Sequence, residues 1–265
     1  MTIFTQVRRY WQLSGAIGGP TASARIASFL TALSIPARKK LLGRKARTIM
    51  IRIRPGSAPR AFLARDAADI AVLIEMFVDR EYSLPLGASA PASIVDIGSH
   101  VGASVLSFKA AYPDAVIAAY EPDPENFALL QANTAGLEGV TCMNVAVAAQ
   151  AGRIAFYAHD DSSISGSISR RSLSDKAVEI VAECFDDVVA RRRPDLVKFD
   201  VEGAEYAVFG GSRSLAMVPR YIGELHLDLI APRTDRDFYA LFGGYDIVVE
   251  KISPARSIIC LSRRV

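Results

Sequence analysis

The stretch that decides the fold runs from Ser93 to Gly102 and reads Ser-Ile-Val-Asp-Ile-Gly-Ser-His-Val-Gly. Its apolar beginning is typical of a buried strand, and helical periodicity follows the second glycine. Gly98 permits a tight turn in which the backbone approaches a ligand, and Gly102 lets a helix begin close to the strand. The stretch therefore predicts a strand, a glycine turn and the start of a helix.

Outward from this stretch, short apolar strands alternate with amphipathic helices, which is typical of a doubly wound, largely parallel sheet. The last two strands lie only five residues apart across Ser253 and Pro254, so they must form a hairpin. We therefore expect an α/β, Rossmann-like, mostly parallel seven-stranded sheet that ends in an antiparallel strand. The expected strands are 92–97, 115–120, 140–146, 195–200, 220–227, 245–251 and 257–262, and the expected helices are 102–111, 124–135, 185–192, 204–215 and 235–243.

Three regions are predicted along the 265 residues. Residues 92–265 form the main domain, and residues 46–91 lead into it with a strand at 48–54 and a helix at 66–79. Residues 1–45 are a basic N-terminal extension, predicted to be helical because Ile26, Phe29, Leu30 and Leu33 follow helical spacing. We expect the rest of the chain to keep its fold when this extension is removed.

Charge is distributed unevenly although the net charge is only +3. Residues 1–65 contain 13 of the 31 Lys and Arg residues and no acid, whereas the remaining 200 residues carry 18 basic and 28 acidic side chains. Such an arm is compatible with peripheral contact with a membrane or another anionic partner, and equally with docking on the protein's own acidic body.

No apolar run approaches the roughly 20 residues needed to cross a bilayer. Arg8-Arg9 resembles the start of an export signal, but Gly18-Gly19-Pro20 interrupts the apolar segment that should follow, so we expect a cytoplasmic protein. The three cysteines are scattered and indicate neither a zinc site nor a disulfide framework. The sequence leaves the oligomeric state open.

Two acids at neighbouring strand ends are candidate ligand contacts. The pattern around Asp96 is Asp-x-Gly-x-x-x-Gly and not the dinucleotide pattern Gly-x-Gly-x-x-Gly, so it leaves room for an amino acid moiety whose ammonium Asp96 would face. Glu121 follows 25 residues later and is placed to accept both hydroxyls of a ribose, which disfavours NADP. NAD fits Glu121 but not the glycine pattern.

Three ordered motifs resemble the FkbM family of S-adenosylmethionine-dependent methyltransferases. Residues 95–102 resemble its first motif, and Glu121-Pro122-Asp123-Pro124 resembles its second-strand signature. The most specific match is Lys-x-Asp-x-Glu-Gly-x-Glu from Lys198 to Glu205, followed by Glu224-x-His226. The resemblance covers residues 50–255 and leaves out the basic arm. It departs at His100, where the family usually has Asn, and at Ser99, where it often has Ala.

The resemblance implies a class I methyltransferase fold with S-adenosylmethionine as cofactor. Adenine would rest at the end of the third strand, and a serine-rich loop at 160–167 would cover the ligands. His100 would donate to the cofactor carboxylate and could titrate near neutral pH. The residues expected to bind the cofactor are Asp96, Gly98, Ser99, His100, Gly102, Glu121, Asn144 and Ala146.

Methyl transfer from a sulfonium is an in-line displacement that requires alignment but no metal, and an alcohol acceptor also needs a base. The candidate catalytic residues are Asp200, Glu202 and His226. Asp200 is the first choice as base or acceptor-positioning group, and His226, oriented by Glu224, is an alternative base. Either Glu202 or Glu205 is expected beside Asp200, with the other capping the next helix. A divalent cation on Asp200, Glu224 and His226 is a further possibility, but we expect no metal.

These residues favour O-methylation of a hydroxyl on a sugar or another small polar metabolite, as the resemblance implies. Two alternatives stay open: methylation of a carboxyl or nitrogen, and cofactor binding without turnover. Nucleic acid is not an expected acceptor, because the aromatic-flanked Pro-Pro dipeptide typical of base methylation is absent after the fourth strand.

Overall fold

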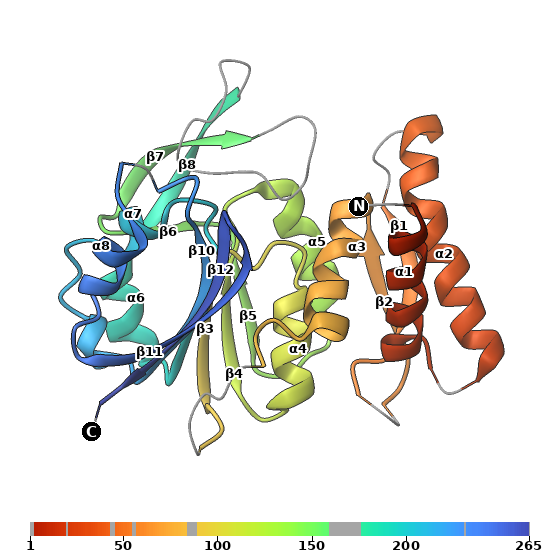
Figure 1. Cartoon of the computed structure of the whole chain (residues 1–265), viewed down its shortest axis with the longest axis horizontal. Helices are drawn as coiled ribbons and strands as arrows, with labels where there is room; N and C mark the ends of the chain where they lie inside the picture. Colours follow the sequence, from red (N-terminus) through yellow and green to blue (C-terminus); the bar gives the residue numbers. More distant parts are fainter. Residues whose placement is uncertain are drawn as a thin grey trace.

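The computed structural model describes residues 3–19, 21–42, 46–54, 57–83, 89–158, 176–230 and 232–264. Two long helices come first, a small hairpin and a helix follow, and a seven-stranded sheet forms the body (Figure 1). The serine-rich segment 160–167 and its predicted role lie outside the described residues.

The large sheet has the strand order β11-β12-β10-β9-β3-β4-β5. Five strands are parallel, and β12 is antiparallel to both of its neighbours, which confirms the predicted fold class. The β11–β12 connection is too short for a crossover, so a hairpin results. The strands are β3 (Ser93–Ile97), β4 (Val116–Tyr120), β5 (Val140–Met143), β9 (Leu196–Phe199), β10 (Arg220–His226), β11 (Tyr245–Ser253) and β12 (Arg256–Arg263).

Helices cover both faces of this sheet (Figure 1). Successive strand residues point to opposite faces: Ile94 packs with α4 (Ala103–Ala111) and α5 (Pro124–Thr134), whereas Val95 packs with α6 (Phe185–Arg192), α7 (Glu205–Phe209) and α8 (Asp235–Ala240). The strand order reverses beside β3, which has β4 on one side and β9 on the other. The crevice at such a switch point is where open α/β sheets bind ligands.

A second, three-stranded sheet was not predicted. The expected strand 140–146 ends at Met143, and the chain then forms β6 (Ala146–Ala148), β7 (Gly152–Ala158) and β8 (Lys176–Cys184) in the order β6-β8-β7. Of these, β7 and β8 expose charged residues such as Arg153 and Glu179, so they lack the apolar run that marks a buried strand. The single strand expected at 140–146 is therefore wrong.

Helix 204–215 is also shorter than predicted. Helix α7 ends at Phe209, and only a single 3₁₀ turn, η2 (Leu215–Met217), follows. Two consecutive glycines, Gly210 and Gly211, stop the helix, and Gly211 has a φ of 82° that a side chain rarely adopts. The three cysteines are all free.

The lead-in segment contains an additional strand. The expected strand 48–54 is β1 (Arg47–Ile51), and β2 (Arg60–Ala64) pairs with it in antiparallel fashion. The expected helix 66–79 consists of α3 (Ala67–Ile74) and a π-helical turn, η1 (Glu75–Asp79). Asp66 caps the start of α3, because its side chain accepts the backbone N–H groups of Ala68 and Asp69.

The N-terminal extension is two helices, α1 (Ile3–Ile17) and α2 (Ala22–Leu42), that pack against the lead-in segment (Figure 1). Their inner side chains belong to one apolar cluster with β1, β2, α3 and α4. The expectation that the extension can be removed without cost is therefore not supported. Among the helices in the described part of the chain, none has the length and hydropathy to cross a bilayer.

Candidate active site

The glycine turn after β3 and the end of β9 meet at the switch point of the large sheet. Gly98 has a φ of 77°, and a Cβ atom on it would lie 1.9 Å from the carbonyl oxygen of Asp200. No side chain fits in that space. Gly98 is therefore required for the close approach of two strand ends, in addition to any approach to a ligand.

A pocket of about 310 Å³ lies beside this turn. The turn at 98–100, the start of α4 and the end of β9 form one wall, and α3, η1 and Tyr82 form the other. Its volume lies at the lower end of the range for small-molecule sites. Glu75, Met76 and Tyr82, all from the lead-in segment, were not predicted as site residues.

Asp96 is fully buried and is held by two protein partners. Lys198 Nζ lies 3.1 Å from its Oδ1 atom, and Ser104 Oγ donates a hydrogen bond of 2.6 Å to Oδ2. Lys198 Nζ also donates to the carbonyl oxygen of Gly98 at 2.7 Å. Burial lowers the pKa of Lys198, but Asp96 and Asp200 outweigh it and raise that pKa, so the ammonium is retained. Asp96 thus supports the turn from beneath, and its predicted contact with a cofactor ammonium stays a prediction.

His100 faces the pocket from a left-handed backbone conformation with a φ of 48°. Neither ring nitrogen makes a hydrogen bond within the described residues, although Nε2 lies 3.5 Å from Oδ1 of Asp69. Burial lowers the pKa of His100, so the ring is neutral at neutral pH and does not titrate there. Buried ring nitrogens without partners are available to a ligand.

Glu121 is the acid at the tip of β4, and it is nearly buried. Its two oxygens accept backbone N–H groups from His100 at 2.8 Å and from Asp123 at 3.0 Å. Burial raises the pKa of Glu121 to about 7. Asn144 holds the same strand tip by donating to the carbonyl oxygens of Glu121 and Pro122.

The other predicted cofactor residues lie at different distances from the turn. Ser99 is part of it and donates its Oγ hydrogen bond to the Asp96 carbonyl oxygen. Gly102 caps α4 with a φ of 92°. Ala146, in contrast, belongs to β6 and is buried with Ala148 and Ala182, away from the residues that line the pocket. The split of the third strand accounts for this displacement.

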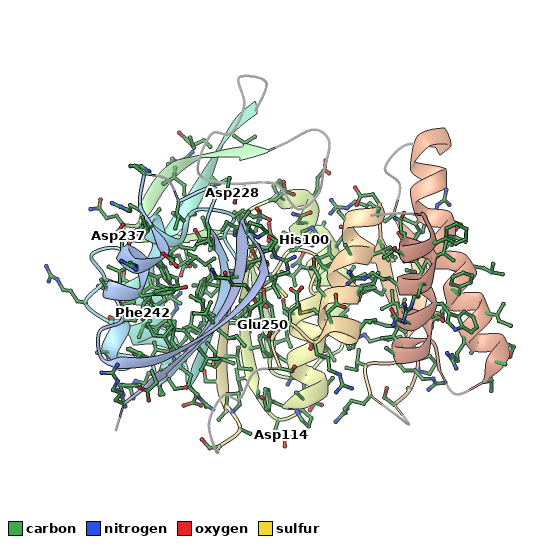
Figure 2. All side chains as sticks on the ribbon, viewed as in Figure 1. His100, Asp114, Asp228, Asp237, Phe242 and Glu250 are labelled. Atoms are coloured by element: carbon green, nitrogen blue, oxygen red, sulfur yellow. The ribbon has the colours of Figure 1, made fainter. Side chains whose placement is uncertain are left out.

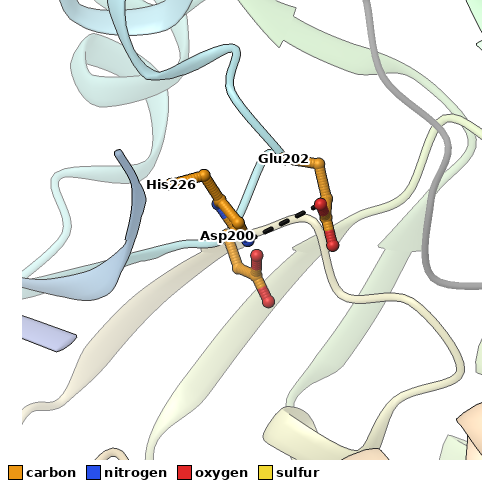
Figure 3. Close-up of side chains that lie close together, drawn as sticks. All are labelled: Asp200, Glu202 and His226. Atoms are coloured by element: carbon orange, nitrogen blue, oxygen red, sulfur yellow. Dashed lines mark ion pairs between the residues drawn. The ribbon is translucent and has the colours of Figure 1, made fainter. Parts of the chain in front are cut away.

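His226 ends β10 and is surrounded by carboxylates (Figure 3). Its Nδ1 atom lies 3.2 Å from Oε1 of Glu205, and its Nε2 atom lies 3.1 Å from Oε1 of Glu224 and 3.5 Å from Oε2 of Glu202. Both ring nitrogens therefore face acceptors, which requires a proton on each. Burial lowers the pKa of His226, but the hydrogen bonds to Glu205 and Glu224 outweigh it and raise the pKa to about 11.

A doubly protonated ring has no lone pair with which to accept a proton. The arrangement therefore disfavours the predicted role of His226 as a general base. Glu224 does orient the ring, as expected, and Glu205 also accepts the backbone N–H of Gly203 at 3.1 Å. Glu202, whose φ is 53°, lies on the side of the ring that faces Asp200.

Asp200 lines the pocket directly beside the glycine turn. Its Oδ1 atom is buried and has no hydrogen-bond partner within the described part of the chain. Figure 2 gives the setting of these side chains between the two halves of the molecule. An unpaired buried carboxylate oxygen is expensive unless a ligand group completes it, so Asp200 fits a role in binding or proton transfer.

Asp200, Glu202 and His226 offer possible metal ligands within 4.8 Å of one another. Glu202, and not the predicted Glu224, completes this group. A metal needs the neutral imidazole, however, whereas this ring is held as the cation by three carboxylates. We therefore interpret the cluster as an ion pair network and assign no metal to it.

Arg256 extends the network to the lead-in segment. It pairs with Glu224 of β10, with Glu81 at 2.6 Å and with Glu75 at 3.5 Å. Burial raises the pKa of Glu75 to about 7 and that of Glu81 to about 8. The network fastens η1 to the strand that carries His226 and so fixes one wall of the pocket.

Sequence reasoning missed Lys198 and the lead-in residues as parts of the site. Lys198 carried a signal, because one lysine stands in the otherwise apolar strand Leu196–Phe199. Glu75 and Tyr82 carried none, since only the folding of η1 onto β3 and β9 brings them to the pocket.

The strand order, with an antiparallel strand inserted beside the last parallel one, and acids at two neighbouring strand tips define a Rossmann-like class I methyltransferase. The family model described as the methyltransferase FkbM domain matches residues 96–232, just over half of the chain. The chain belongs to this family, and its cofactor is S-adenosylmethionine. No curated protein matches the chain.

Solved structures with a similar fold include three methyltransferase-type proteins. The fibrillarin/Nop5p complex matches at 9% identity over 72% of this chain and 81% of that chain, with a TM-score of 0.48. Precorrin-6y C5,15-methyltransferase from Geobacter metallireducens GS-15 matches at 13% identity over 76% and 88%, with a TM-score of 0.42. Human N-acetylserotonin methyltransferase in complex with SAM matches at 13% identity over 74% and 55%, with a TM-score of 0.40. These likenesses carry no information about the substrate.

Proposed function

We propose that the protein is an O-methyltransferase that transfers the methyl group of S-adenosylmethionine to a hydroxyl of a sugar or another small polar metabolite, with Asp200 as the base. The observation that carries the proposal is the buried, unpaired Oδ1 atom of Asp200 in the pocket beside the glycine turn. The neighbouring His226 is already protonated, so Asp200 is the better candidate for accepting a proton.

Several features fit the cofactor. The ring of His100 and the N-terminus of α4 offer donors for its carboxylate, and Glu121 offers acceptors for the ribose hydroxyls. Asp96 has no exposed surface, so we assign it a positioning role: it holds Lys198 and Ser104, which in turn support the turn. Asn144 keeps the tip of β4 in place.

The cofactor, once bound, supplies an electrophilic methyl group on a sulfonium and leaves as a neutral thioether. The protein aligns the acceptor oxygen with that methyl group, and such alignment accounts for much of the acceleration. Asp200 accepts the hydroxyl proton on Oδ1 as the oxygen attacks. Glu202, Glu205 and Glu224 hold the His226 cation in a fixed position beside Asp200.

The charge of the pocket favours a hydroxyl over a carboxylate as acceptor. Asp200 and Glu75 line it, and Glu202 lies next to Asp200. An anionic acceptor would be repelled by these carboxylates, and it would have no use for a base. A neutral polyol meets neither difficulty and can donate hydrogen bonds to the same oxygens.

The test is methyl transfer from labelled S-adenosylmethionine to a panel of free sugars, sugar nucleotides, carboxylic acids and amines. We expect label in at least one hydroxyl compound, in a product that resists mild base. Label confined to base-labile esters or to amines would overturn the O-hydroxyl assignment. Binding of the cofactor without transfer to any compound of the panel or of a cell extract would favour a protein without turnover.

A further inference from the structure

Six apolar side chains of the N-terminal helix pair point away from the protein. Along α1 they are spaced three and four residues apart, and along α2 four and three, so on each helix they share one side. Phe4 is 87% exposed, Leu30 is 56% exposed and Trp11 is 45% exposed. We call this surface the outer face of the helix pair; its members are Phe4, Val7, Trp11, Ile26, Leu30 and Leu33.

The outer face is continuous across the two helices. The ring of Trp11 on α1 packs edge-on against Phe29 of α2, with centroids 5.5 Å apart. The guanidinium of Arg25 on α2 lies 5.1 Å from the same ring. A tryptophan therefore stands at the seam, between apolar side chains of both helices and a cation.

The outer face is not needed for the core of the protein. The opposite sides of the same helices bury Tyr10, Leu13 and Ile17 from α1, and Ala32 and Ile35 from α2, against the lead-in segment. The sequence pattern of Ile26, Leu30 and Leu33 had predicted the packed side of α2, but the structure turns these residues outward. An exposed apolar surface of this kind marks an interaction site.

Charge specifies the kind of partner. Residues 1–65 contain 13 basic side chains and no acid, and Arg8 is exposed beside Val7 on α1. An anionic surface complements such a region. A second copy does not, because a symmetric contact would place the same acid-free surface against itself. Nucleic acid would satisfy the arginines but would leave the apolar side chains without a partner.

We propose that the outer face docks on the surface of a bilayer that contains anionic phospholipids. The apolar side chains would enter the boundary between headgroups and acyl chains, Trp11 would lie at the headgroup level, and Arg8 and Arg25 would meet lipid phosphates. The helix pair is the end of the molecule farthest from α8, so the body extends away from the lipid surface (Figure 1).

Docking on lipid would leave the active site intact and close to the membrane. Helix α1 contacts η1, where Arg9 pairs with Asp79, and η1 carries Glu75 and Met76 of the pocket wall. The outer face itself contributes no residue to the pocket. Loss of membrane binding is therefore distinguishable from loss of methyl transfer.

The test is co-sedimentation of the full chain with vesicles of phosphatidylcholine alone and of phosphatidylcholine mixed with phosphatidylglycerol. We expect sedimentation with the mixed vesicles and little with the neutral ones. High salt should release the bound protein, because exposed charges are screened at high ionic strength. Absence of binding to the mixed vesicles would overturn the proposal.

Matched variants test the surface itself. Phe4→Ala and Leu30→Ala should each weaken binding to the mixed vesicles by about tenfold, and Arg8→Gln by about fivefold. Met217→Ala removes a side chain that is 60% exposed elsewhere on the body, and Arg236→Gln removes an exposed charge on α8; both should bind like the unchanged protein.

Two results would contradict the proposed occupant. If Phe4→Ala and Met217→Ala bind vesicles equally, the outer face is not the lipid-binding surface. If sedimentation velocity shows a dimer that Leu30→Ala abolishes, a second copy covers the face. Circular dichroism of each variant confirms that the fold is retained.

Discussion

Nδ1 of His226 lies 3.2 Å from Oε1 of Glu205, a carboxylate with no exposed surface, and this contact fixes the protonation of the site. Glu224 and Glu202 occupy the other ring nitrogen, so the ring is a cation that cannot serve as a base. The chemistry of proton removal then falls to Asp200. The predictions below follow from this arrangement and from the packing around it.

His226→Gln should destabilise the fold by about 3 kcal/mol, because it leaves buried carboxylates without their cation. The pKa of His226 in the folded state, about 11, is higher than its ordinary value of 6.5. Its contribution to stability is therefore complete below pH 6.5 and is lost as pH rises toward 11. Thermal unfolding measured between pH 6 and 10 should show a steeper loss for the unchanged protein than for His226→Gln; parallel curves would contradict the protonated ring.

Gly98→Ala should abolish cofactor binding and cost about 3 kcal/mol or more in stability, because its Cβ would meet the Asp200 carbonyl oxygen. Gly136→Ala is the matched control: Gly136 has a similar positive φ of 74° with no atom within 4 Å of the added Cβ. It should cost only about 1–2 kcal/mol. Urea unfolding of both variants separates the clash from the backbone preference, and equal losses would argue against the close approach of β3 and β9.

Cofactor affinity should decline as pH falls through about 7. The raised pKa of Glu121 means that its carboxyl becomes protonated there, and a protonated carboxyl accepts fewer ribose hydroxyls. Calorimetry with S-adenosylhomocysteine between pH 6 and 8 should show this decline, by up to about tenfold per pH unit below the pKa. Glu121→Gln should bind weakly with little dependence on pH, and an unchanged slope in this variant would assign the effect to another group.

The N-terminal helices should contribute to the stability of the whole protein. Ile35→Ala, in the buried face of α2, should cost about 2–4 kcal/mol, whereas Leu30→Ala, on the outer face, should cost less than about 0.5 kcal/mol. Urea unfolding measures both. Equal stability of the two variants would mean that the helix pair does not share the core of the body.

The sequence was informative wherever local pattern and function coincide. The seven strands of the large sheet, the antiparallel end and the glycine turn at Gly98 follow from apolar runs, loop length and glycine positions. Asp200 and His226 were recognisable because strand ends of a parallel sheet converge at one edge. The family resemblance was confirmed over residues 96–232.

What the sequence could not give depends on long-range packing. Glu75 reaches the pocket only because η1 folds against β9 and Arg256 fastens it there. The protonation of His226 depends on three carboxylates whose distances no spacing rule predicts. The outward side of α2 was misread because Ala32 and Ile35, smaller or less numerous than the exposed residues, form the buried stripe.

The most direct test of the account compares Asp200→Asn with Asp228→Asn, which changes an exposed carboxylate shortly after β10 (Figure 2). Cofactor affinity is measured by calorimetry and methyl transfer by label incorporation into the hydroxyl acceptor that the panel identifies. We expect Asp200→Asn to retain cofactor affinity and to lose turnover by about 100-fold or more, with Asp228→Asn unchanged in both. Undiminished turnover in Asp200→Asn would contradict the assignment of Asp200 as the base.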